Sequence, residues 1–274
     1  MANRAAAHPL NQELGLLSKR FAKIYRDAEP FPHFSVDGLF DEHMLRGVLG
    51  EFPAPESPLW TTHNHSYSKK LANDNFFAWG PLTRELMVFL NSAQFLTFLE
   101  ALTGIPALIP DPYYFGGGLH LIRPGGFLGV HADFNWHDRL KLDRRINLLL
   151  YLNPDWKQEY GGAIELWTPD MKTRVNAYLP LFNRLVVFNT TDFSYHGHPE
   201  PLRCPEAHCR RSIALYYYTN GRPRHEISAP HSTLYRRHSD LVNAGVIHPN
   251  LFYQWVPPVV YSLGARVKRI FDER

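Results

Sequence analysis

A histidine and an aspartate, His131 and Asp133, stand two residues apart in a short segment whose composition predicts a β-strand. Side chains alternate faces along a strand, so this imidazole and this carboxylate point the same way and can bind one metal ion. A third candidate ligand, His196, follows in a later β-type segment. Two histidines and one carboxylate form the facial set that leaves three coordination positions open on Fe(II). These residue types therefore indicate a metal site with room for further ligands.

The order of the segments after His131 adds specificity, because a chain with 15 histidines contains a His-x-Asp pair easily by chance. The segments are Arg145–Asn153, Trp156, Gly161–Trp167, Phe182–Phe188, Ser194–Gly197 and Arg210–Tyr218. In this order they resemble the prolyl-4-hydroxylase-like branch of the Fe(II)- and 2-oxoglutarate-dependent oxygenases, over residues 117–219.

The resemblance implies a dioxygenase that uses Fe(II), 2-oxoglutarate and O2, with ascorbate as a reductant, and releases succinate and CO2. It also implies that His131, Asp133 and His196 hold the iron. Because Asp133 fills the position that related halogenases leave to chloride, we expect hydroxylation of a C–H bond, although desaturation begins in the same way. The substrate would be an amino-acid residue, a peptide or a small metabolite.

The same resemblance places a basic residue near the start of the last core strand, where it pairs with the distal carboxylate of 2-oxoglutarate. Arg210 and Arg211 compete for this role. We favour Arg210, because it shares a face with Ser212 and small residues, whereas Arg211 would point outward. Tyr151 and Asn147 share a strand face and are further candidates for the co-substrate pocket, with core packing as the alternative for Tyr151. The candidate cofactor-binding residues are Arg210, Tyr151, Ser212 and Asn147.

Four more polar residues could border the substrate. They are His120, Arg123, Asn135 and His198. His198 would share a strand face with His196, and the family's Ser-x-His-Gly pattern favours His196 as the ligand. The interval from His196 to Arg210 is longer than this branch usually has, and we interpret it as an insertion.

The pattern of apolar residues predicts a mainly β, closed or folded-over architecture with helical support (α+β). The resemblance implies that this architecture is a double-stranded β-helix of the jelly-roll or cupin-like type, with N-terminal helices packed on it. Helices are expected over 10–26, 41–50 and 82–102, the last broken near Asn91. The expected strands are Gly117–Arg123, Phe127–His131, Arg145–Leu152, Ala163–Trp167, Arg174–Leu179, Arg184–Phe188, Tyr195–His198 and Arg211–Thr219.

We divide the chain into a helical region (1–110), a catalytic core (111–221) and a C-terminal extension packed on the core (222–274), within one structural domain. Segments 60–79 and 113–115 could form a lid or packed surface. Only two cysteines occur, Cys204 and Cys209, which excludes a disulfide framework and favours a reducing, cytoplasmic location, although the two could still pair.

The balance of 29 basic and 26 acidic residues argues against a protein whose main task is binding nucleic acid. No apolar run reaches the length of a membrane span. We therefore expect a small molecule, a peptide or a protein as the partner, and the oligomeric state stays open. Two alternatives remain: a non-redox cupin-type protein that binds a sugar or a metal, and an interaction module that uses the basic C-terminal segment. Succinate formation dependent on 2-oxoglutarate would distinguish an oxygenase from the non-redox cupin-type protein. Salt-sensitive binding to nucleic acid would support the interaction module.

Overall fold

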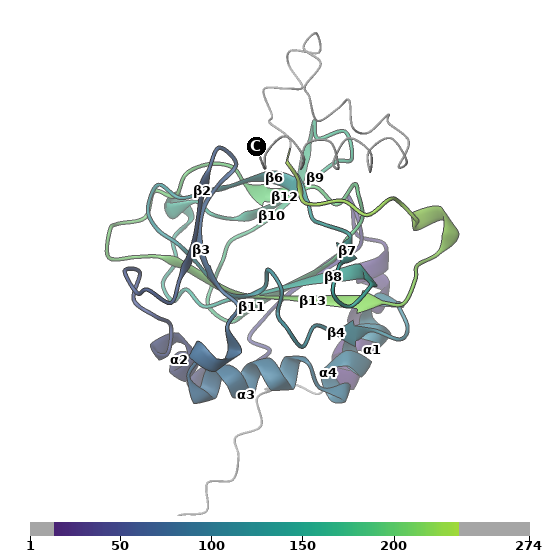
Figure 1. The fold of residues 1–274 in the computed structure, drawn as a ribbon, viewed down its shortest axis with the longest axis horizontal. Coiled ribbons are helices and arrows are strands. Elements are labelled where there is room, and N and C mark those ends of the chain that lie inside the picture. The colour runs from purple at the N-terminus through teal and green to yellow at the C-terminus, as the bar shows by residue number, and fades with distance from the viewer. Residues whose placement is uncertain (1–13, 236–274) are drawn as a thin grey trace, which may run out of the picture.

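The computed structural model describes residues 14–235, in which antiparallel strands curl around a common interior (Figure 1). The eight core strands are β5 (Gly118–Ile122), β6 (Leu128–Ala132), β8 (Leu142–Tyr151), β9 (Ile164–Trp167), β10 (Arg174–Tyr178), β11 (Arg184–Asn189), β12 (His196–His198) and β13 (Arg210–Thr219). These are the strands that the sequence predicts, at similar boundaries.

The core strands form two sheets, with the orders β11-β8-β13-β5 and β6-β12-β9-β10. Most connections along the chain pass from one sheet to the other, as in a double-stranded β-helix. The predicted fold class is therefore confirmed. The antiparallel pairing places β6 and β12 side by side, and it places β13 between β5 and β8.

Further strands extend these sheets in segments for which no strand is predicted from the sequence. They are β1 (His33–Asp37), β2 (Thr61–His65), β3 (Ser68–Asn73), β4 (Ile109–Pro110), β7 (Trp136–His137) and β14 (Leu234–Tyr235). Strand β3 pairs with both β5 and β6 and so joins the two sheets on one side, while β2 forms a hairpin with β3. Segment 60–79 is thus part of the barrel wall rather than a separate lid.

Four α-helices cover the outer face of the β11-β8-β13-β5 sheet (Figure 1). They are α1 (Leu14–Arg26), α2 (Glu42–Gly50), α3 (Pro81–Leu90) and α4 (Ala93–Thr103), and three short 3-10 helices span Phe76–Ala78, Gln158–Tyr160 and Arg224–Glu226. Asp41 caps α2 by accepting a hydrogen bond from the Met44 amide. The predicted break near Asn91 is confirmed, because Asn91 ends α3 and Ser92 caps α4.

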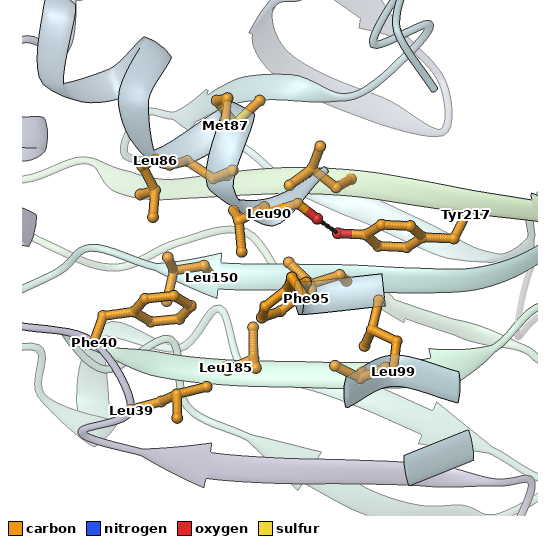
Figure 2. Packing of buried hydrophobic residues seen from close by; sticks show 14 of the residues in the cluster. Leu39, Phe40, Leu86, Met87, Leu90, Phe95, Leu99, Leu150, Leu185 and Tyr217 are labelled. Atoms are coloured by element: carbon orange, nitrogen blue, oxygen red, sulfur yellow. Dashed lines mark hydrogen bonds between the residues drawn. The ribbon is translucent and has the colours of Figure 1, made fainter. Parts of the chain in front are cut away.

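Strand alternation divides the side chains of β13 between the core and the barrel interior. Ile213, Leu215 and Tyr217 face the helices and belong to the main apolar cluster, whereas Arg210 and Ser212 face inward. Figure 2 shows this cluster, in which the Tyr217 hydroxyl donates a hydrogen bond of 2.9 Å to the carbonyl of Leu90. The helices therefore fix the sheet from outside and leave its inner face to polar residues.

Cys204 and Cys209 are both free thiols and both buried, so they do not pair in this structure. Within residues 14–235 no single helix has the length and apolarity of a membrane span, and only α3 and α4 taken together, bent by 48°, pass such a test. The segment 236–274, including the apolar stretch 253–267, lies outside the described residues.

Candidate active site

Three potential metal ligands converge inside the barrel: His131, Asp133 and His196. His131 lies near the end of β6, Asp133 follows that strand directly, and His196 opens β12 opposite His131 in the antiparallel pair. Nε2 of His131 is 3.4 Å from Oδ1 of Asp133, and Nε2 of His196 is 3.4 Å from Oδ2. All three side chains are buried. The pairing of two strands thus brings together residues that are distant in sequence.

Hydrogen bonds to the backbone fix which nitrogen of each imidazole faces this centre. Nδ1 of His131 lies 2.8 Å from the carbonyl of Gly129, and Nδ1 of His196 lies 2.8 Å from the carbonyl of Ser194. A carbonyl only accepts, so each Nδ1 carries the hydrogen and each Nε2 presents a lone pair toward Asp133. The ring of Phe188 packs against that of His196, with centroids 4.6 Å apart. Both imidazoles are therefore oriented as metal ligands usually are.

The ionisation states also suit a metal. Burial, with a contribution from His131, lowers the pKa of His196 to about 4, which keeps this imidazole neutral. Burial would raise the pKa of Asp133, but the positive charge of Arg144 holds it well below its usual value. Two imidazoles and one carboxylate with their donor atoms facing one point fit a divalent ion such as Fe(II).

Asp133 is held from behind by two residues of β8. Arg144 Nη2 and Asn147 Nδ2 donate hydrogen bonds of 2.9 Å and 2.7 Å to its Oδ2. The Arg144 guanidinium lies over the rings of Tyr216 and Phe134, at 3.4 Å and 4.3 Å from their centroids. Asn147 was predicted to line the co-substrate pocket, but its amide instead supports the carboxylate.

Sequence reasoning missed Arg144, because simple alternation from Tyr151 would place its neighbour Arg145 inside the barrel. The register of β8 against β13 shifts between Tyr217 and Tyr218, so that Arg144 lies opposite Tyr218. Arg145 instead hydrogen bonds to Thr219 and Glu226. A bulge of this kind has no reliable signal in one sequence.

A second polar group gathers around Arg210 on the inner face of the larger sheet. Arg210 Nε donates to the carbonyl of Gly162 at 2.8 Å, and Nη2 donates to the hydroxyl of Tyr151 at 3.1 Å. Ser212 lies opposite Tyr151 on one side and His120 on the other. Among the described residues no carboxylate forms an ion pair with Arg210, although its side chain is buried. A buried guanidinium in this state is suited to an anionic ligand.

The barrel interior contains further polar atoms that lack a partner within residues 14–235. They are Nε2 of His120 and both ring nitrogens of His198. Burial lowers the pKa of both histidines well below the usual value, so both rings are neutral. Buried polar atoms are normally satisfied, and a polar ligand between the metal ligands and Arg210 would satisfy these. A β-bulge between His196 and His198 separates the two histidines in the pairing with β6.

Two of the predicted substrate residues, Arg123 and Asn135, have partners elsewhere, and Arg211 faces outward as expected. Arg123 pairs with Glu56 at 3.0 Å on the outside of the barrel. Asn135 uses both ends of its amide to bind Ser228, Ala229 and His231, so it anchors the segment after β13. The Arg211 guanidinium donates to the carbonyl of Cys209 and does not face inward.

Two residues outside the predicted set lie near the metal triad. Tyr235 of β14 pairs with His131, its ring centroid 5.3 Å from that imidazole, and it stacks on Tyr67 of the β2–β3 turn. Lys70 of β3 has Asp133 as a nearby charge. Both depend on pairings between strands that are remote in sequence, so their position had no local signal.

Comparison with known proteins finds a family match for the β core. Residues 117–218 match the family model of the 2OG-Fe(II) oxygenase superfamily. Prolyl 3-hydroxylase OGFOD1 from Xenopus laevis is 27% identical over 145 residues, which are 50% of this chain and 27% of that protein. OGFOD1 from Mus musculus is 35% identical over 86 residues, 30% of this chain and 15% of that protein. The aligned part is therefore a minor share of either relative.

Solved structures support the same fold. A prolyl 4-hydroxylase from Phytophthora capsici has a TM-score of 0.54 at 18% identity, over 87% of this chain and 75% of that one. A prolyl hydroxylase from Trichoplax adhaerens, solved with a peptide of the hypoxia-inducible-factor oxygen degradation domain, has a TM-score of 0.53 at 16% identity, over 76% of this chain and 94% of that one. At these identities the likeness concerns the fold.

Proposed function

We propose that this chain, a member of the prolyl-4-hydroxylase-like branch of the 2OG-Fe(II) oxygenase superfamily, hydroxylates a C–H bond with consumption of 2-oxoglutarate and O2. The observation that carries this proposal is that the convergent triad and the buried Arg210 face the same barrel interior, both within electrostatic reach of His198, and that Arg210 has no carboxylate partner among the described residues. The reaction converts 2-oxoglutarate, O2 and R–H to succinate, CO2 and R–OH.

In this proposal His131, Asp133 and His196 hold the metal. Bound Fe(II) supplies the O2 activation that couples decarboxylation of 2-oxoglutarate to oxygen insertion. Arg144 and Asn147 keep Asp133 in place through its Oδ2, and the carbonyls of Gly129 and Ser194 keep the imidazoles in the correct tautomer. The chain thereby presents a preformed ligand set.

Arg210 and the Tyr151 hydroxyl bind the distal carboxylate of 2-oxoglutarate, with Ser212 on the same strand face. The backbone of Gly162 makes room for this arrangement: a Cβ there would lie 2.5 Å from Leu202 Cδ2 and 3.1 Å from Arg210 Cδ. His120 and His198, with their unsatisfied nitrogens, line the same pocket. Arg211 has no role in this site.

The substrate is a peptide or a small molecule. Within that range an amino-acid residue in a peptide is supported by the names of the relatives, which are prolyl hydroxylases, one of them solved with a peptide. A cytoplasmic location is part of the proposal and rests on the two free cysteines.

The test is 2-oxoglutarate-dependent succinate formation by the purified full chain with Fe(II) and ascorbate. We expect succinate to form with the wild-type protein, and His196→Ala to abolish it. A non-redox cupin-type protein would bind the metal and form no succinate. That result would exclude the proposed function.

A further inference from the structure

Lys70 lies on the wall of the barrel and faces its interior. Strand β3 pairs with β5 so that Ala72 lies opposite His120, an inward-facing residue. Alternation places Lys70 on the same face as Ala72, and it places Lys69 and Leu71 on the other. Lys69 is exposed and Leu71 packs against the helix-side core, in agreement with this assignment.

The charge of Lys70 has no direct partner. Within residues 14–235 no hydrogen bond, ion pair or ring contact involves its ammonium group. Burial lowers the pKa of Lys70 to about 8, with Asp133 raising it and Arg144 and Arg210 lowering it further. At pH 7 the side chain therefore still carries its proton, in the same interior as these three groups.

Around Lys70 the described residues carry more positive than negative charge. Lys70 interacts electrostatically with one carboxylate, that of Asp133, and with two guanidinium groups, those of Arg144 and Arg210. Fe(II) and 2-oxoglutarate have opposite charges of equal size, so loading the site leaves this excess unchanged. The distal carboxylate would match Arg210, and Arg144 is stabilised by Asp133 and by two aromatic rings. Lys70 is the cation that remains without compensation among these three.

Lys70 also differs from the two arginines in its access to solvent. Arg144 and Arg210 are buried, whereas Lys70 is half-buried and lies in the β2–β3 hairpin opposite His63, which is half-buried too. An unpaired ammonium group in a partly dehydrated site is costly, and a ligand carboxylate would offset that cost.

We propose that Lys70 binds a carboxylate of the substrate, so that this enzyme acts on an acidic molecule held beside the metal. The inference rests on the proposed function, and it narrows the substrate class. The carboxylate could belong to a free organic acid or to an aspartate or glutamate side chain in a peptide. The two sources share one chemistry and are separated by experiment.

The test is calorimetric binding to the full chain loaded with Mn(II) and 2-oxoglutarate, which needs no turnover. The probes are matched acids and amides: butyrate with butyramide, and the capped pentapeptide acetyl-Ala-Ala-Glu-Ala-Ala-amide with its glutamine analogue. We expect an acid to bind the wild-type protein and its amide to bind at least about tenfold more weakly, as for one lost charge-assisted hydrogen bond. Butyrate and the peptide distinguish the two sources.

The variants are Lys70→Met and, as a matched control on the opposite face of the same strand, Lys69→Met. Lys70→Met should weaken acid binding by about tenfold and leave 2-oxoglutarate binding within about twofold, whereas Lys69→Met should change neither. Lys70→Arg, which keeps the charge, should retain most of the acid binding. It is the variant to compare with the wild-type protein if Lys70→Met does not fold.

Three results would overturn the proposal: equal binding of acids and amides, failure of every acid to bind, or loss of 2-oxoglutarate binding in Lys70→Met. The last result would make Lys70 a co-substrate residue. Failure of the wild-type protein to bind 2-oxoglutarate at all would instead contradict the proposed function, so the two failures are distinguishable.

Discussion

The guanidinium of Arg144 donates a hydrogen bond of 2.9 Å to Oδ2 of Asp133, the carboxylate of the candidate metal triad. Arg144 is fully buried, and its guanidinium carbon lies over the ring of Tyr216, 3.4 Å from the centroid. The metal ligand is therefore fixed by a residue that is itself immobilised by packing. The other oxygen, Oδ1, remains directed toward His131, at 3.4 Å from Nε2.

Arg144→Met should weaken metal binding by about 10- to 100-fold, the usual effect of losing a residue that supports a ligand. The reason is that Asp133 keeps only the Asn147 hydrogen bond and loses the neighbouring positive charge. Competition between the protein and a fluorescent chelator for Mn(II) measures this change.

Arg145→Met is the matched control, since this side chain points away from the cavity to Glu226 and Thr219. It should lower stability and leave Mn(II) affinity unchanged. Equal losses of affinity in both variants would mean that Arg144 does not act through Asp133.

Arg210→Met should weaken 2-oxoglutarate binding by about 2–3 kcal/mol, or roughly 30- to 150-fold, because a buried carboxylate would lose its charged partner. Arg211→Met should leave that affinity unchanged, since its guanidinium faces away from the cavity. Equilibrium binding to the Mn(II)-loaded protein checks both. The reverse pattern would show that Arg211 is the ligand.

Leu150→Ala should destabilise the fold by about 2–5 kcal/mol, as expected for a cavity in a packed core. Leu150 is fully buried on β8, between the sheet and the helices (Figure 2). Leu16→Ala, at a side chain that is 63% exposed, should cost little. Chemical denaturation measures both, and a small loss for Leu150 would argue against the helix-covered core.

The ion pair of His231 with Asp192, 3.0 Å long, should make stability depend on pH. Burial opposes the charge of His231, but the hydrogen bond that its Nε2 donates to Asp192 raises the pKa of His231 above 6.5. The hydrogen bonds that Asp192 accepts from His231 and Ser228 outweigh burial and lower the pKa of Asp192 below 3.8. Because the pKa of His231 is higher in the folded state, protonated His231 stabilises the folded protein fully below pH 6.5. This contribution is lost as the pH rises through the pKa that His231 has in the folded state. Because the pKa of Asp192 is lower in the folded state, ionised Asp192 stabilises the folded protein above pH 3.8. This contribution is lost as the pH falls through the pKa that Asp192 has in the folded state.

The pair therefore stabilises the protein most between these two limits. Asp192→Asn should cost more stability at about pH 5.5 than at about pH 8.5, measured by denaturant unfolding of both proteins at each pH. An equal cost at the two pH values would show that the pair contributes no charge interaction.

The sequence predicts the eight core strands because each has alternating or continuous apolar residues between clear turn signals. It also predicts that Arg210 faces inward and Arg211 outward, since both lie on a regular strand. It does not predict Arg144, whose direction depends on a register shift, or Lys70, whose strand joins the barrel by pairing with residues about fifty positions away. Long-range pairing and local irregularity leave no periodic pattern in one chain.

We expect His131, Asp133 and His196 to form one metal site beside a pocket for 2-oxoglutarate. Calorimetric titration of the metal-free full chain with Mn(II), followed by 2-oxoglutarate, measures both binding events. We predict one Mn(II) per chain, 2-oxoglutarate binding that requires the metal, and loss of both in His196→Ala. Unchanged Mn(II) and 2-oxoglutarate binding in that variant would show that His196 is not a metal ligand.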